Sequence, residues 1–135
     1  MQKNISDYTN YNYKKEFWEN TDRTYEDMCE KQVIKAYLET LPKHQVIGDA
    51  GCGFGRLTET YSPFASKIVM IDYAINMLQE SIKTTKNLNN IDYVQSDLNK
   101  LNIPTHSLNT MISIRTMHHL QDPSSFINEA HRVIK

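Results

Sequence analysis

Short apolar runs alternate with amphipathic segments along most of this chain. Four runs have the length and apolar content of buried strands: residues 45–49, 67–72, 91–95 and 110–114. Three segments are predicted as helices: residues 56–61, residues 74–86 and the stretch from 123 onward. Strands separated by helical segments predict a parallel sheet joined by right-handed crossovers. We therefore predict an α/β fold with a doubly wound parallel sheet in the strand order 3-2-1-4.

The two longer helices come with expected buried faces. In residues 74–86 this face holds Ile75, Leu78 and Ile82. The last helix has an N-cap signal, Asp122, with Pro123 at its first helical position. Its expected buried face comprises Phe126, Ile127, Ala130, Val133 and Ile134.

A further helix is expected ahead of the first strand. It begins near Thr24, where Thr24 and Asp27 nearly match a capping box, and Pro42 ends it. Its apolar positions follow a helical period and predict the buried face: Tyr25, Met28, Cys29, Val33, Tyr37, Leu38 and Leu41. We divide the chain into an N-terminal helical cap, residues 1–44, and a ligand-binding core, residues 45–135.

Residues 1–20 are polar and aromatic, which fits a disordered arm or a cap that lays aromatic rings over a ligand. The aromatic residues of this segment that suit a lid are Tyr11, Tyr13, Phe17 and Trp18.

Composition narrows the classes of function. A formal net charge of −1 gives no electrostatic footprint for nucleic acid or for an anionic membrane. The chain shows no signal peptide and no apolar run of membrane-spanning length, so we expect a cytoplasmic protein. Cys29 and Cys52 lack the spacing of metal ligands, and no metal site is expected.

The chemistry of the chain concentrates after the first predicted strand. Asp49 ends that strand, and Gly51, Gly53 and Gly55 follow at alternate positions before a helix begins. Such a turn lets backbone lie against a ligand at the carboxyl edge of a sheet. Asp72 ends the next strand about twenty residues on, the spacing at which a carboxylate can accept hydrogen bonds from a ribose.

The glycine spacing bears on which nucleotide-like ligand fits. The dinucleotide fingerprint G-x-G-x-x-G requires a third glycine where this chain has Arg56. A nicotinamide-dependent oxidoreductase therefore stays as an alternative that Arg56 disfavours. The strand order places Asp49, Gly51, Asp72, Asp97 and Arg115 at convergent strand ends, so one crevice should collect them.

Residues 46–57 carry the pattern D-x-G-x-G-x-G and resemble the first motif of the class I S-adenosylmethionine (SAM)-dependent methyltransferases, which have a Rossmann-like fold. The resemblance runs through most of residues 45–135. Residues 71–78 are similar to the family's second strand and following turn. Residues 94–98 are similar to its third motif. Residues 111–123, with H-H-x-x-D-P, resemble the fourth strand and loop of the small-molecule, quinone-biosynthesis-like subgroup.

The resemblance implies a role for each matched residue. Asp72 would hold the ribose of SAM or of its product S-adenosylhomocysteine, and Tyr73 and Met77 would flank the adenine. Asp97 would accept from the adenine amine, and the Leu98 N–H would bond a ring nitrogen. Arg115 would contact the cofactor or form a surface ion pair. His118 and His119 are candidates for a general base or for holding the substrate.

Two other arginines carry open alternatives. Arg23 pairs with Glu26 or Asp27, or it reaches the methionine carboxylate of SAM. Arg56 is expected to cap structure near the helix start.

The family normally continues into three further strands, so the resemblance implies that this chain is truncated at its C-terminus. An unpaired edge at the fourth strand would then invite pairing, and a homodimer through that edge is expected. Two readings of function follow: a methyltransferase acting on a small-molecule acceptor by in-line displacement, or a non-catalytic SAM-binding or assembly module. Cap and loops set the acceptor, which the sequence leaves open.

Overall fold

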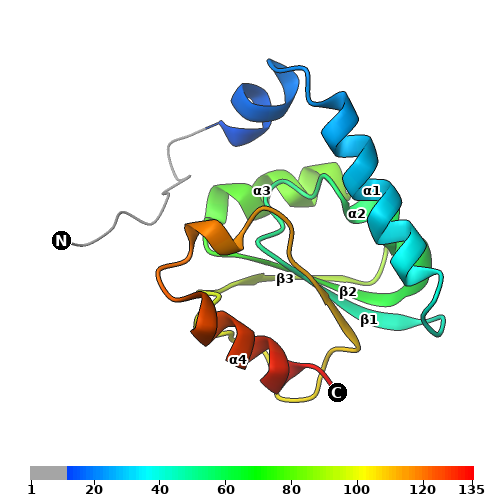
Figure 1. Cartoon of the computed structure of the whole chain (residues 1–135), viewed down its shortest axis with the longest axis vertical. Coiled ribbons are helices and arrows are strands. Elements are labelled where there is room, and N and C mark those ends of the chain that lie inside the picture. Colours follow the sequence, from blue (N-terminus) through cyan, green and yellow to red (C-terminus); the bar gives the residue numbers. More distant parts are fainter. Residues whose placement is uncertain (1–11) are drawn as a thin grey trace.

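A computed structural model describes residues 12–135 (Figure 1). Its sheet has four strands: β1 (Gln45–Ala50), β2 (Ala65–Asp72), β3 (Ile91–Gln95) and β4 (Thr110–Ile112). All strand pairs are parallel, and the order is β3-β2-β1-β4. The predicted α/β fold, a Rossmann-like doubly wound sheet in the order 3-2-1-4, is confirmed.

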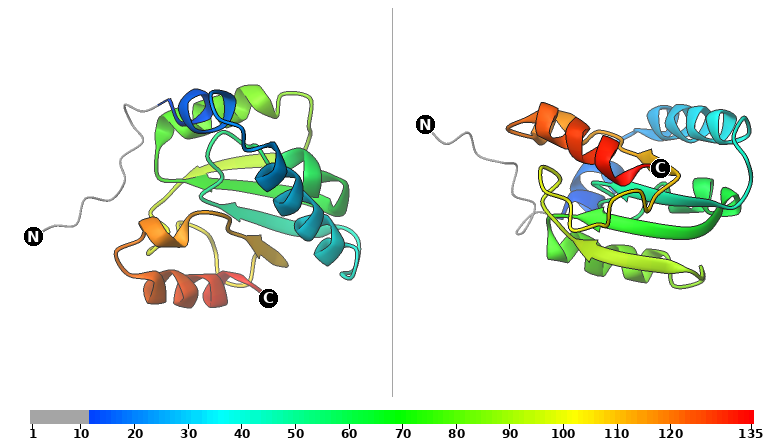
Figure 2. Two further views of the ribbon diagram at one scale, coloured as in Figure 1. Left: turned by 45° about the horizontal axis from the view of Figure 1, so that its top comes forward. Right: turned by 90° about the horizontal axis from the view of Figure 1, so that it is seen from below.

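Helices cover both faces of the sheet (Figure 1; Figure 2, left). The helices are η2 (Lys14–Glu19), α1 (Thr24–Leu38), α2 (Thr58–Tyr61), η3 (Ser62–Phe64), α3 (Ile75–Thr84), η4 (Met117–His119) and α4 (Pro123–Val133). In β2, Ile68 and Met70 pack in one core cluster with α1, α2 and α3 residues. Val69 and Ile71 point to the opposite face, where α4 and the segment before β4 form the second cluster.

The rotation of α1 differs from the prediction. Tyr25 is 79% exposed, and Met28, Val33 and Tyr37 are exposed as well. The buried apolar residues of α1 are Ile34 and Leu38, which share a face with Glu26 and Glu30. On that face Glu26 pairs with Arg115, and Glu30 pairs with Arg56 and Arg115. Apolar periodicity therefore predicted the buried Leu38 correctly, but placed Tyr25, Met28, Val33 and Tyr37 on the buried face in error.

Helix α1 begins at Thr24 as predicted, but the expected capping box is not formed. Arg23 occupies the N-cap position, and no side chain caps the helix. Asp27 instead pairs with Lys31 and Arg56. Helix α4, by contrast, begins as predicted: the Asp122 carboxylate accepts from the N–H groups of Ser124 and Ser125, and Pro123 is the first helical residue.

The buried faces of α3 and α4 are narrower than predicted. Ile75 and Ile82 are each 47% exposed, while Met77, Leu78 and Ser81 make the buried face of α3. In α4, Phe126 and Val133 are buried and Ile127 is exposed.

The segment that follows α4 lies beside the entry to β4. Ile134 forms a parallel bridge with Leu108, and the Lys135 N–H donates to the Leu108 carbonyl at 2.9 Å. The edge that the sequence left unpaired is therefore engaged at Leu108. Within residues 12–135, no helix is long and apolar enough to cross a membrane.

Candidate functional site

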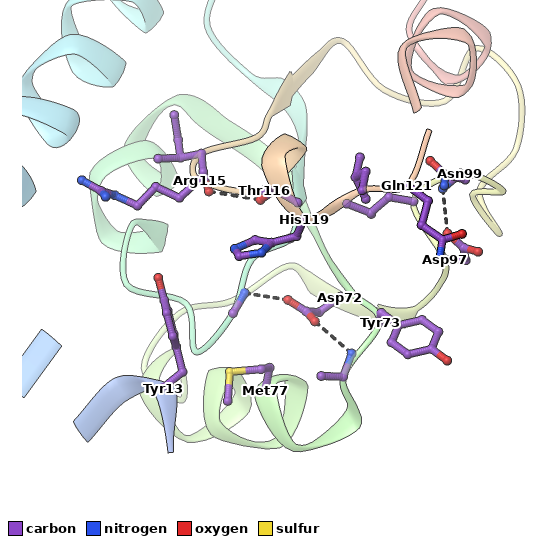
Figure 3. Close-up of a pocket in the computed structure, with 16 residues that line it drawn as sticks. Tyr13, Asp72, Tyr73, Met77, Asp97, Asn99, Arg115, Thr116, His119 and Gln121 are labelled. Carbon is purple, nitrogen blue, oxygen red and sulfur yellow. Dashed lines mark hydrogen bonds between the residues drawn. The ribbon is translucent and has the colours of Figure 1, made fainter. Parts of the chain in front are cut away.

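A cleft opens at the carboxyl ends of the four strands (Figure 3). The turn after β1, the ends of β2 and β3, and the loop after β4 all contribute to it. Most of the predicted site residues line it: Gly51, Gly53, Asp72, Tyr73, Met77, Asp97, Leu98, Arg115 and His119. Asp49, Gly55 and His118 do not, and each has a different environment.

The three glycines of the turn do three different things. Gly51 has a φ of 77°, and a Cβ there would lie 2.3 Å from the Thr116 hydroxyl oxygen. Gly53 has a φ of 54°, but a Cβ there would meet nothing within 4 Å, because this position faces the open cleft. Gly55, at a φ of 81°, is packed against side chains of α2, β2 and the end of α3. Gly53 is thus the position where a bare backbone leaves room for a ligand.

Asp72 ties the glycine turn to the start of α3. One carboxylate oxygen accepts from the Gly53 N–H at 2.9 Å, and the other accepts from the Ala74 N–H at 2.9 Å (Figure 3). Burial raises the pKa of this carboxyl, while the backbone donors oppose the rise. Asp72 therefore binds the backbone just ahead of α3 and also faces the cleft. Each oxygen keeps a further lone pair for a hydroxyl donor.

Asp49 lies beneath the turn rather than in the main cleft. Its carboxylate is 3% exposed and accepts from the Tyr61 hydroxyl at 2.7 Å. Desolvation raises the pKa of Asp49 to about 7, against the opposing hydrogen bond from Tyr61. Asp49 borders a second, smaller hollow together with Arg56 and Trp18, and this hollow shares Gly51 and Gly53 with the main cleft.

Asp97 and Leu98 occupy the turn that follows β3. The Asp97 carboxylate accepts from the Asn99 N–H at 2.8 Å, and the Lys100 N–H donates to the Asp97 carbonyl at 3.1 Å. Leu98 is buried while lining the cleft. Just before this turn, the Ser96 N–H donates to the Asp72 carbonyl at 3.0 Å, which fixes the two acidic strand ends relative to each other.

Arg115 turns toward the cap, although its backbone borders the cleft (Figure 3). Its guanidinium donates to Glu30 at 2.6 Å and to Glu26 at 2.8 Å. These carboxylates raise the pKa of Arg115 against the effect of burial. Arg115 has a φ of 58°, a conformation that non-glycine residues rarely adopt. The ion-pair alternative therefore describes Arg115 in this structure.

The other two arginines also bind the cap. Arg23 pairs with Glu26 at 2.6 Å. Arg56 pairs with Asp27 and Glu30, and its guanidinium lies 3.8 Å from the centre of the Trp18 ring. Arg56 is expected from the sequence to cap the start of a helix, but it joins the glycine turn to α1 instead. The acidic partners of Arg56 lie far away in the sequence, so no local pattern reveals them, whereas the pairing of Arg23 with Glu26 is local and was one of its predicted alternatives.

Among the described residues of the cap, an aromatic ring borders the cleft. Tyr13 lines it, and stacks on Phe17 with ring centres 5.0 Å apart. Phe17 and Trp18 pack on each other and on arginines. Tyr11 lies outside the described residues.

Two histidines form η4 in the loop after β4. His119 lines the cleft, and its ring lies 3.8 Å from that of His118. Burial and the neighbouring His118 lower the pKa of His119, so its imidazole is neutral at neutral pH. A neutral imidazole can accept a proton, which keeps His119 as the better of the two candidates for a base.

The cleft also contains residues that the sequence reasoning did not single out: Ala74, Asn99, Ile114, Thr116, Leu120 and Gln121. They follow the second, third and fourth strands directly. Their common signal is position, because every loop after a parallel strand opens at the same edge. Among residues 12–135, no group of three or more histidine, cysteine or acidic side chains is placed to hold a metal ion.

Comparisons with known proteins give a family match and similar chains. A family model described as a methyltransferase domain matches residues 48–135. The chain is 27% identical over 109 residues to an uncharacterized 37.1 kDa transposon protein from Streptomyces fradiae. It is 28% identical over 128 residues to the mitochondrial ubiquinone biosynthesis O-methyltransferase of Dictyostelium discoideum. These matches cover 78% and 80% of this chain, but only 31% and 39% of the two relatives.

Solved structures share the fold. The YcgJ protein from Bacillus subtilis superposes with a TM-score of 0.74 at 19% identity, over 80% of this chain and 47% of that protein. A SAM-dependent methyltransferase from Aquifex aeolicus gives a TM-score of 0.71 at 22% identity, over 78% of this chain and 58% of that enzyme. This chain thus spans about a third to just over half of the proteins that it resembles.

Proposed function

This chain belongs to the methyltransferase domain family, and on that premise we propose that it binds SAM in the cleft and transfers the methyl group to a small-molecule acceptor. The observation that carries the proposal is the convergence of Asp72 and Asp97 on a glycine turn with open space at Gly53. Two carboxylates at neighbouring strand ends suit a ribose and an adenine amine.

The residues of the cleft have room and chemistry for this cofactor. Asp72 would accept from the ribose hydroxyls with the lone pairs that Gly53 and Ala74 leave free. Asp97 and Leu98 would read the adenine edge, with Met77 and Tyr73 beside the ring. The smaller hollow beside Asp49 would take the methionine end. When bound, SAM supplies a methyl group activated by the positive sulfonium.

The chain's own contribution is placement and exclusion of water. Methyl transfer needs an acceptor atom aligned with the bond that breaks, and proximity accounts for much of the acceleration. We propose that the cap, described from residue 12 on and assigned to residues 1–44, closes over the cleft through Tyr13. The apolar side chains of Ile114 and Leu120 would keep the reacting atoms away from water.

Titration calorimetry with SAM, S-adenosylhomocysteine and NAD tests the cofactor assignment. We expect saturable binding of the first two, no binding of NAD, and loss of affinity in Asp72→Ala. Because Asp72 also accepts from the N–H of Ala74, the residue that precedes α3, thermal unfolding of the variant serves as the control for folding. Binding of NAD in preference to SAM would favour an oxidoreductase and contradict the proposal. Cofactor binding without turnover of any acceptor would instead favour a SAM-binding module.

The similarity to the Dictyostelium O-methyltransferase supports testing hydroxyl acceptors first. A hydroxyl must lose a proton, and we propose that the neutral His119 accepts it. His119→Asn should lower kcat by roughly a hundredfold while leaving cofactor affinity unchanged. His118→Asn is the matched control, since His118 does not line the cleft. Equal losses in both variants would remove His119 from the reaction.

We also retain the homodimer as a proposal for the sheet edge beside β4. Engagement of Leu108 by Ile134 leaves less backbone for a partner than the sequence suggested. Light scattering of the purified chain decides between a monomer and a dimer.

A further inference from the structure

The connection between β3 and β4 is a long segment of turns and bends, residues 96–109, that contains no helix and no strand. Its first turn carries Asp97, Leu98 and Asn99 into the cleft. Backbone N–H and C=O groups that are buried need hydrogen-bond partners, and this segment has no regular helix or strand that would supply them. What holds this segment therefore decides where Asp97 and Leu98 stand.

Some of those partners are local, since the Ser96 hydroxyl donates to the Lys100 carbonyl at 3.3 Å and accepts from the Asn102 N–H at 2.9 Å. Two side chains of α4 supply others. Glu129 accepts from the Leu101 N–H at 2.7 Å, and Arg132 donates to the Leu101 carbonyl at 2.9 Å. Arg132 also donates to the Ile103 carbonyl at 2.9 Å. The side chains thus bind both backbone groups of Leu101, as a neighbouring strand would.

Glu129 and Arg132 hold each other in place as well. Two guanidinium nitrogens of Arg132 donate to the two carboxylate oxygens of Glu129, at 2.8 and 2.7 Å. The hydrogen bond from Arg132 keeps the pKa of Glu129 below its usual range, so the pair is ionised at neutral pH. Planar guanidinium geometry allows one side chain to serve a carboxylate and two carbonyls at once, which lysine cannot do.

The turn is consequently fixed at both ends. At its start, the Ser96 N–H donates to the carbonyl of Asp72, and at its end the α4 pair binds Leu101. Only residues 97–100 lie between these two anchors. A displacement at Leu101 would move Asp97 and the Leu98 N–H together, because the Lys100 N–H donates to the Asp97 carbonyl.

We propose that Glu129 and Arg132 form a positioning pair that sets how selectively the cleft reads adenine, without touching the ligand. This inference rests on the proposed function, in which Asp97 and Leu98 read the adenine edge. Neither Glu129 nor Arg132 lines the cleft. Their effect therefore passes through the backbone of the turn.

The test compares two ligands that differ at one group of the base. S-adenosylhomocysteine carries the exocyclic amine, and S-inosylhomocysteine carries a carbonyl in its place. The ratio of their dissociation constants measures base reading, separately from overall affinity or stability. We expect the wild type to prefer the adenine ligand, and Arg132→Lys to reduce that preference roughly tenfold because one carbonyl anchor is lost.

Two further variants complete the design. Glu129→Gln keeps the size of the side chain but removes its charge, and should also reduce the ratio. Glu80→Gln is the matched control, since Glu80 and Lys83 form an ion pair of the same i,i+3 spacing on α3, 2.6 Å apart and exposed. The control should leave the ratio unchanged. Hydrogen exchange at the Leu101 amide should accelerate in Glu129→Gln and stay protected in the control.

The outcomes separate the two proposals. An unchanged ratio in both α4 variants, with wild-type discrimination intact, overturns the positioning role even if the variants melt earlier. Failure of the wild type to bind S-adenosylhomocysteine overturns the proposed function, and this inference falls with it. Arg132→Lys keeps the charge and the aliphatic stem, so it is the variant that should fold most like the wild type.

Discussion

Asp49 and Asp72 end neighbouring strands, yet their carboxyl groups meet different surroundings. Asp72 accepts from two backbone N–H groups, which suit a charged carboxylate. Asp49 has the Tyr61 hydroxyl as its hydrogen-bond donor and lies almost entirely out of water. A buried carboxyl with few donors favours its protonated form. The two aspartates should therefore respond differently to pH.

Stability should change with pH through Asp49. Its pKa is about 7 in the folded chain, against an ordinary value of 3.8. A raised pKa of an acid means that the folded state loses stability as pH rises from about 4 to about 7. Asp49→Asn removes this loss, so its advantage over the wild type should grow by up to about 4 kcal/mol between pH 4 and pH 8.

Chemical denaturation of wild type and Asp49→Asn across this range measures the difference directly, because other titrating groups cancel between the two proteins. Asp49→Asn keeps an oxygen that can accept from Tyr61. A difference in unfolding free energy that stays constant with pH would show that Asp49 is charged throughout, and would contradict its environment as described here.

Changing Gly53 to alanine should mainly weaken ligand binding, whereas changing Gly55 to alanine should mainly destabilise the fold. Both have positive φ, so each change costs about 1 kcal/mol of backbone strain. A Cβ at Gly55 would also press on Thr58, Met70 and Thr85 at 3.2 to 3.3 Å, and should destabilise the fold further. A Cβ at Gly53 enters the open cleft and should weaken SAM binding at least tenfold. Thermal unfolding and calorimetry together separate these effects, and equal loss of affinity in both variants would contradict the assignment.

At the scale of elements, α1 is attached to the core by charge as much as by apolar contact. Glu26, Asp27 and Glu30 bind Arg56 of the glycine turn and Arg115 of the loop after β4. The arginine side chains are mostly shielded from water, at 13% and 31% exposure, so these pairs are worth more than surface pairs. These ion pairs fix the position of α1 relative to the glycine turn and to the loop after β4.

Glu30 is the carboxylate shared by both arginines, and Glu30→Gln should loosen α1. We expect a loss of roughly 1–3 kcal/mol in stability and faster hydrogen exchange along α1. Glu39→Gln is the control, because Lys35 of α1 and the C-cap residue Glu39 form an exposed pair 4.0 Å apart. If the two variants exchange alike, the arginine pairs do not hold the cap.

The positions of the helices and strands can be predicted from the sequence, but the face that a helix buries cannot always be. Strand positions, sheet order and the Asp122 cap of α4 depend on local patterns, which the sequence displays. The face that α1 buries depends on Arg56 and Arg115, whose partners lie about 30 to 90 residues away. Long-range pairing of this kind overrides apolar periodicity. The same long-range pairing decides between the two alternatives for Arg115: the residue borders the cleft as predicted, and its guanidinium forms the ion pair with Glu30 and Glu26.

For the whole molecule, the parallel sheet explains how distant residues form one site. Because all four strands are parallel, their carboxyl ends lie at one edge of the sheet. The turns after β1, β2, β3 and β4 therefore meet there. This convergence could be predicted from sequence, including Asp72 and Asp97. The exclusion of Asp49 and Gly55 from the cleft could not, because it depends on the pleat of β1 and the packing beneath the turn.

A crystal structure of the chain with S-adenosylhomocysteine tests the central claim most directly. We predict the ribose hydroxyls at the Asp72 carboxylate, the adenine between Met77 and Leu98 with its amine at Asp97, and the homocysteine end toward Asp49. Ligand bound elsewhere on the molecule, or in this cleft with the base away from Asp97, would contradict the account.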